Sequence, residues 1–143
     1  MEQALRGAID FDTAFTLPIT PQPEDFDELG HVNNVTYLRW TQDIATTHWR
    51  TIAGPELQET YIWVALRHEI DYRDQILPGE EVIARTWLGR ARGPRFHRNV
   101  DIRKVGAKRA SASVLTDWCL LDIATRKPMR VTADILETFG VPG

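Results

Sequence analysis

One amphipathic segment, followed by a change of hydrophobic period, limits the folds open to this 143-residue chain. Between residues 35 and 52, apolar and amphipathic side chains recur at helical spacing, and Ala53-Gly54-Pro55 is a stop signal. After Gly54 the period becomes two, which is the spacing of a strand with one face toward a core. A single long helix followed by strands predicts an α+β domain, because one helix can cover only one face of a sheet.

Five segments carry the spacing of strands, one before the helix and four after it. They cover residues 15–19, 62–73, 82–88, 96–103 and 110–123, with prolines and glycines between them. In the second segment, strict alternation places Ile62 and Tyr72 on the core face, and Trp63 and Glu69 on the other. We therefore expect a five-stranded antiparallel sheet wrapped around one long central helix. Residues 132–139 are expected to form a short terminal helix or an extended tail.

Charge and composition exclude several classes of function. The chain has 17 basic and 20 acidic residues in no long blocks, which argues against a nucleic-acid binder. No segment approaches the roughly 20 apolar residues that cross a bilayer, and the acidic N-terminus, with Glu2 and Asp10, does not resemble a signal peptide. Cys119 is the only cysteine, so no intrachain disulfide can form. These features predict a single domain over residues 1–143 in the cytoplasm.

The chemistry-bearing residues gather just ahead of the helix, in the stretch FDELGHVNNVTYLRW. Asp27, Gly30 and His31 precede the helix start, and either Asn33 or Asn34 is a good N-cap. The first amide groups of a helix have no intrahelical acceptor and stabilise an oxyanion. A carboxylate beside them supplies a base or a nucleophile. This combination predicts acyl chemistry.

The segment DELGHVNNVTYLRW resembles the signature of the hotdog-fold thioesterases related to 4-hydroxybenzoyl-CoA thioesterase and the acyl-acyl-carrier-protein thioesterases. Residues 68–82 and 116–131 resemble the second and last strands of that family, so the likeness covers nearly the whole chain. The resemblance implies a hotdog fold and an acyl-CoA or acyl-carrier-protein thioester as substrate. It implies no metal or redox cofactor. It also implies a homodimer or a dimer of dimers, because a lone protomer leaves its sheet edge and half of its site incomplete.

Three catalytic roles follow from the resemblance. Asp27 matches the catalytic carboxylate, acting as nucleophile on the thioester carbonyl or as base for a water. The backbone amide around Asn34 matches the group that polarises the thioester oxygen. His31 would orient Asp27 or a water, or donate to the acyl oxygen. The alternatives are an Asx turn for Asp27 and a structural hydrogen bond for His31.

The candidates for substrate contact are Asn33, Tyr37, Glu69, Arg92 and Arg95. Tyr37 has packing in the core or an interface as its alternative. Glu69 is the nearest match to a second-strand glutamate used by some acyl-carrier-protein branches. Those branches also carry an asparagine where this chain has Leu29, which favours the CoA branch. Arg92 and Arg95 would grip CoA phosphates from a hairpin loop over residues 89–95, with a solvated hairpin tip as the alternative.

Two other functions fit the same fold. One is a hydratase-type lyase acting on enoyl-CoA, in which aspartate and histidine are five residues apart; Asp27 and His31 are separated by four. The other is a non-catalytic acyl-CoA-binding protein. The remaining histidines are dispersed and lack the spacing of metal ligands.

Overall fold

A computed structural model describes residues 8–141, so that Glu2 lies outside the described part of the chain. The strands are β1 (Phe15–Ile19), β2 (Tyr61–Tyr72), β3 (Val82–Arg92), β4 (Arg95–Lys104) and β5 (Ala112–Asp122). The helices are the short 3-10 turn η1 (Pro23–Asp25), the long α2 (Asn34–Ile52), and the short α3 (Pro55–Thr60) and α4 (Ala133–Phe139). The helix alternative for residues 132–139 is thus confirmed.

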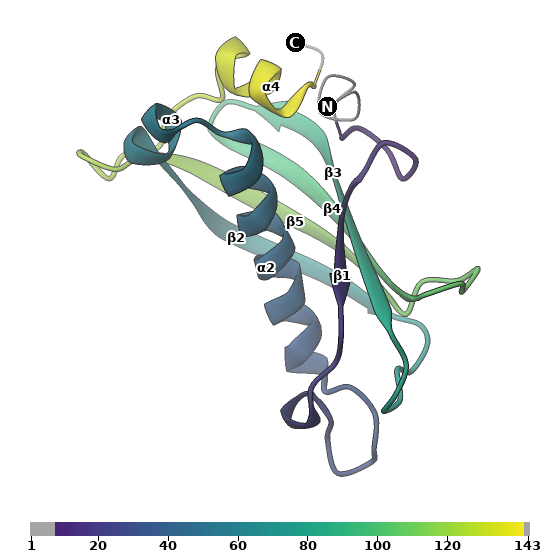
Figure 1. The fold of residues 1–143 in the computed structure, drawn as a ribbon. Coiled ribbons are helices and arrows are strands. Elements are labelled where there is room, and N and C mark those ends of the chain that lie inside the picture. The colour runs from purple at the N-terminus through teal and green to yellow at the C-terminus, as the bar shows by residue number, and fades with distance from the viewer. Residues whose placement is uncertain (1–7, 142–143) are drawn as a thin grey trace.

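The five strands form one antiparallel sheet in the order β1-β3-β4-β5-β2, and α2 lies across one face of it (Figure 1). The predicted α+β architecture is confirmed. The loop that carries Asp27 lies at one end of this layout, while α3, α4 and the β3–β4 hairpin lie at the other. None of the described helices is long and apolar enough to cross a membrane.

The helix α2 begins and ends where local chemistry requires. Asn33 is the N-cap, and its Oδ1 accepts a hydrogen bond from the Val35 N–H at 2.9 Å. This decides between Asn33 and Asn34, which the sequence pattern left as alternatives. At the other end Ala53 is the C-cap, and Gly54-Pro55 starts a new helical turn, α3, that the sequence pattern did not predict.

Two hydrophobic clusters fill the space between α2 and the sheet. The cluster nearer the helix start includes Tyr37, Trp40, Ile44, Ala84, Val100, Ile102 and Val114. The cluster nearer its end includes Trp49, Leu88, Phe96, Leu120, Ile135 and Phe139. Four buried polar residues, His48, Thr86, Arg98 and Thr116, each lie between members of both clusters on their own element. A polar layer therefore divides the core.

The two faces of β2 exchange partway along the strand, which strict alternation did not predict. Its pairing register with β5 shifts between Ala65 and Arg67. Trp63 consequently faces the helix and packs edge to face against Trp49, with ring centroids 5.8 Å apart. Ile62 faces away and is 49% exposed. The predicted faces of Trp63 and Ile62 are wrong, because a β-bulge inserts one residue and reverses the alternation beyond it.

The N-cap gives a stability prediction with a matched control. We expect Asn33→Ala to lower the free energy of unfolding by about 1 kcal/mol, because the Val35 N–H loses its acceptor. The side chain of Asn34 makes no hydrogen bond within residues 8–141, so Asn34→Ala should cost less than about 0.5 kcal/mol. Urea denaturation of both variants checks this, and equal losses would contradict the capping role.

Candidate active site

The loop before α2 brings Asp27 and His31 together. The loop is closed by a bridge between Phe26 and Val32, and Asp27 N–H donates to the His31 carbonyl at 2.9 Å. The Asp27 Oδ1 accepts from the Leu29 N–H at 2.9 Å, which is the Asx-turn contact foreseen as an alternative. The Asp27 Oδ2 lies 3.5 Å from His31 Nδ1. The Asp27 side chain keeps 29% of its surface exposed, so its turn contacts leave it accessible to a ligand.

Gly30 allows this loop to be so compact. It has a φ of +84°, in the left-handed region that side chains rarely adopt, and its N–H donates to the Asp27 carbonyl at 3.1 Å. The reversal at Gly30 returns the chain so that His31 faces Asp27. The glycine of the motif therefore positions the two side chains around it.

The helix start next to this loop has an unused donor. The side chain of Asn33 accepts a hydrogen bond from the Val35 N–H, and the backbone carbonyl of Asn33 accepts one from the Thr36 N–H at 2.9 Å. Within residues 8–141, the N–H of Asn34 donates to no acceptor. The first amide of α2 is therefore free to donate to a ligand, and the positive end of the helix dipole strengthens such a bond.

Two of the predicted substrate contacts lie elsewhere in the chain. Tyr37 is 4% exposed and packs edge to face against Trp40 and Tyr72, so the structure favours its core-packing alternative. Burial there raises the pKa of Tyr37 to about 12. Glu69 is on the sheet face opposite the helix, where it pairs with Arg67. Within one chain, Glu69 does not join Asp27.

The predicted phosphate-binding arginines lie at the end of the sheet away from Asp27. Strands β3 and β4 extend through the arginine run to Arg92 and from Arg95, so that only Gly93-Pro94 forms the turn. The expected hairpin loop over residues 89–95 is thus mostly strand. The Arg95 guanidinium forms an ion pair with the buried Asp117, while Arg92 forms none within residues 8–141. Of the two, Arg92 is the better candidate for a phosphate.

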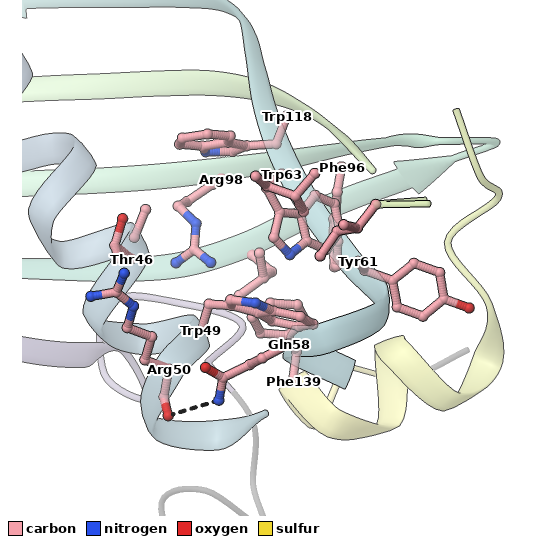
Figure 2. A pocket seen from close by; sticks show the side chains of 14 residues that line it. Thr46, Trp49, Arg50, Gln58, Tyr61, Trp63, Phe96, Arg98, Trp118 and Phe139 are labelled. Carbon is pink, nitrogen blue, oxygen red and sulfur yellow. Dashed lines mark hydrogen bonds between the residues drawn. The ribbon is translucent and has the colours of Figure 1, made fainter. Parts of the chain in front are cut away.

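A pocket of about 380 Å³ opens at the far end of α2 (Figure 2). Its aromatic lining residues are Trp49, Tyr61, Trp63, Phe96, Trp118 and Phe139, and the exposed Thr46 and Arg50 also line it. The first pocket residue on α2, Ala45, is 11 residues beyond Asn34. At 1.5 Å per residue this places the pocket about 16 Å along the helix from the free amide. Within one chain, the first hydrophobic cluster separates the pocket from the Asp27 loop.

Arg98 forms part of the pocket wall and was not among the residues predicted from the sequence. It is 4% exposed, and its Nη1 donates to His48 Nδ1 at 2.9 Å and to Thr86 Oγ1 at 3.0 Å. A signal for it exists in the sequence, because Arg98 shares its strand phase with the apolar residues Phe96 and Val100. A charged residue at a core-facing position is unusual enough to mark a site.

No metal centre accompanies either region. Residues 8–141 contain no group of three or more histidine, cysteine, aspartate or glutamate side chains placed to hold a metal ion. Cys119 is buried and free, as is usual for a small core residue.

His48 should make the fold sensitive to acid. Burial, assisted by the charge of Arg98, lowers the pKa of His48 from 6.5 to about 3. Between these values the unfolded chain binds a proton that the folded chain excludes, so stability is complete above pH 6.5 and falls as pH drops toward 3. From about pH 7.5 to about pH 5.0 the wild type should lose about 2 kcal/mol more than His48→Gln, whose amide oxygen still accepts from Arg98. Urea unfolding at both pH values measures this; identical losses would refute it.

Comparisons with known proteins place the chain in a family. The model of the thioesterase-like superfamily matches residues 21–139. No curated protein matches this chain significantly.

Solved structures agree with that match. A predicted thioesterase from Bacillus stearothermophilus is 24% identical, with 91% of this chain and 99% of that one covered and a TM-score of 0.78. A thioesterase from Thermus thermophilus, complexed with coenzyme A and Zn, is 23% identical, with 87% and 90% covered and a TM-score of 0.75. A 1,4-dihydroxy-2-naphthoyl-CoA thioesterase from Synechocystis is 14% identical, with 89% and 95% covered and a TM-score of 0.73. The predicted hotdog fold is confirmed, and the chain belongs to the thioesterase-like superfamily of thioester hydrolases.

Proposed function

We propose that this protein hydrolyses an acyl-CoA thioester at Asp27, giving a free acid and coenzyme A. The observation that carries the proposal is the pairing of an accessible carboxylate, 3.5 Å from His31, with the unused N–H of Asn34 at the adjacent helix start. Thioester hydrolysis needs a group that activates the attack and a donor for the developing oxyanion. Both lie on one continuous stretch of this chain.

The proposed reaction uses Asp27 as general base or as nucleophile. As base, Asp27 takes a proton from water while the water oxygen bonds to the carbonyl carbon. The Asn34 N–H donates a hydrogen bond to the carbonyl oxygen as negative charge develops there. When the C=O bond re-forms, the C–S bond breaks, and the thiolate takes from Asp27 the proton that came from water and leaves as the thiol. As nucleophile, an Asp27 oxygen bonds to the carbonyl carbon and the C–S bond breaks with loss of the thiolate. Water then hydrolyses the resulting anhydride, which releases the acid, restores Asp27 and supplies the proton of the thiol. His31 Nδ1 positions Asp27 in either route.

Coenzyme A is the proposed thiol, and the cytoplasm the proposed location. The Thermus thermophilus relative binds coenzyme A in its solved structure, which supports a CoA ester over an acyl-carrier-protein ester. Arg92, on the β3–β4 hairpin, is available for a phosphate. A lone cysteine without a disulfide fits a reducing compartment.

We propose a homodimer, or a dimer of dimers, built by pairing of the β2 edges. β2 has 12 residues, contains no proline and has only β5 as a neighbour, whereas the other edge strand, β1, is short and carries Pro18. Antiparallel pairing about a two-fold axis sets the Ile62 end of one β2 beside the Tyr72 end of the other. Tyr72 donates to the Asn34 carbonyl at the helix start, at 3.4 Å. The pocket of one subunit would then open toward the Asp27 loop of its partner.

Asp27→Asn tests the catalytic assignment. The asparagine Oδ1 still accepts from the Leu29 N–H, so the loop should keep its shape, but the base and nucleophile are gone. We expect kcat for thiol release from acyl-CoA to fall roughly 10²- to 10⁴-fold. The exposed neighbour Glu28→Gln removes the same charge and should change kcat less than about threefold. An Asp27→Asn protein as active as the Glu28→Gln control would end the assignment.

Val64→Lys tests the dimer. Val64 is 40% exposed on the β2 edge, where a lysine opposes strand pairing. We expect the wild type to have at least twice the 16.4 kDa chain mass by light scattering and Val64→Lys to have a lower mass with reduced activity. Val105→Lys, on an exposed turn, should leave the mass unchanged. A monomeric wild type, or equal masses for the wild type and Val64→Lys, would rule out pairing through β2.

A further inference from the structure

The aromatic pocket contains a buried cation without a counter-charge. Burial lowers the pKa of Arg98 to about 9, which still leaves the guanidinium charged at neutral pH. Its Nη1 donates to His48 and Thr86, and both of these acceptors are neutral, because the pKa of His48 is about 3. Within residues 8–141, no carboxylate pairs with Arg98, and its Nη2 and Nε make no hydrogen bond.

Two more donors around the same cavity have no acceptor. The indole Nε1 atoms of Trp63 and Trp118 are buried and unbonded, and both residues line the pocket. Figure 2 shows the guanidinium of Arg98 directed into the space between the helix and these two rings. Buried donors are nearly always paired, so the unpaired Nε and Nη2 of the buried Arg98, on a cavity wall, mark a position suited to an acceptor. Phe96 and Phe139, which also line the pocket, offer only apolar surface.

We propose that the pocket binds an organic carboxylate with an apolar, planar body, and that the carboxylate accepts from the free Nε and Nη2 of Arg98. A carboxylate matches the guanidinium in charge and accepts two parallel N–H bonds, while the body stacks among the aromatic walls. A phosphate carries more charge than Arg98 alone can balance in the interior of the cavity, because the other lining arginine, Arg50, is exposed at the surface.

The pocket also indicates the class of acyl group in the substrate, an inference that rests on the proposed hydrolysis. In the proposed dimer the pocket of one subunit faces the partner's Asp27, so the thioester carbonyl lies at the mouth and the acyl tip lies at Arg98. The preferred substrates are then CoA monothioesters of dicarboxylic acids, with the second carboxylate at the tip of the acyl group.

Calorimetry with two isosteric probes tests the pocket without any turnover. Naphthalene-2-carboxylate should bind the wild-type protein at about pH 7.5 roughly 10- to 100-fold more tightly than naphthalene-2-carboxamide. Arg98→Met should remove this preference, and Arg109→Gln, which removes an exposed arginine outside the pocket, should retain it. Equal affinities in the wild type overturn the proposal, and so does a preference that survives in Arg98→Met. The wild-type comparison decides even if Arg98→Met does not fold.

Thiol release from a matched substrate pair separates the two proposals. We expect kcat/KM for 4-carboxybenzoyl-CoA to exceed that for 4-methylbenzoyl-CoA roughly 10- to 100-fold, with the preference lost in Arg98→Met. If neither ester releases thiol but carboxylate binding depends on Arg98, the pocket assignment stands and hydrolysis falls. If both esters are hydrolysed equally and both naphthalene probes bind equally, hydrolysis stands and the carboxylate pocket is refuted.

Discussion

A single helix has to cover one face of a five-stranded sheet that is wider than the helix, and most features of this protein follow from that mismatch in width. The 19 residues of α2 extend about 28 Å, but a helix with its side chains is only about 10–12 Å wide. Five strands at about 4.8 Å spacing span roughly 19 Å between the outer two. The sheet must therefore wrap around the helix, and short elements such as α4 must close its far end. Beside β2 and β5 the cover stays incomplete, and the aromatic pocket opens there (Figure 2).

The polar layer that divides the core lowers the stability of the fold, which points to a function for it. A buried guanidinium loses its hydration, and two neutral acceptors only partly replace it. An apolar residue at position 98, between Phe96 and Val100, would join the two hydrophobic clusters into one. Proteins tolerate such locally unfavourable residues at functional sites. The position of Arg98 on a pocket wall, with donors left over, fits this explanation better than a purely structural role does.

The sequence predicted the parts of this structure that depend on local chemistry. The period change at Gly54 and the asparagine cap each act over a few residues, and the helix start and the succession of strands along the chain after it followed from them. The contact between Asp27 and His31 was one of the roles that the family resemblance implied for His31. The bulge between Ala65 and Arg67 depends on pairing with β5, and the sequence of β2 contains no glycine or proline that would predict it. The pocket was not predictable, because its walls meet only in the folded chain.

The same bulge links the two ends of the molecule. Without it, β2 would place Trp63 and Ile70 on opposite faces, and either the pocket or the first cluster would lose a wall. With it, one strand serves the pocket at its start and reaches the helix start at its end, through Tyr72. These two regions lie about 16 Å apart along α2 within a chain, too far for a compact acyl group to bridge. Antiparallel pairing of two β2 edges would bring the pocket of each subunit beside the helix start of the other. The unpaired edge of β2 would then serve catalysis as well as assembly.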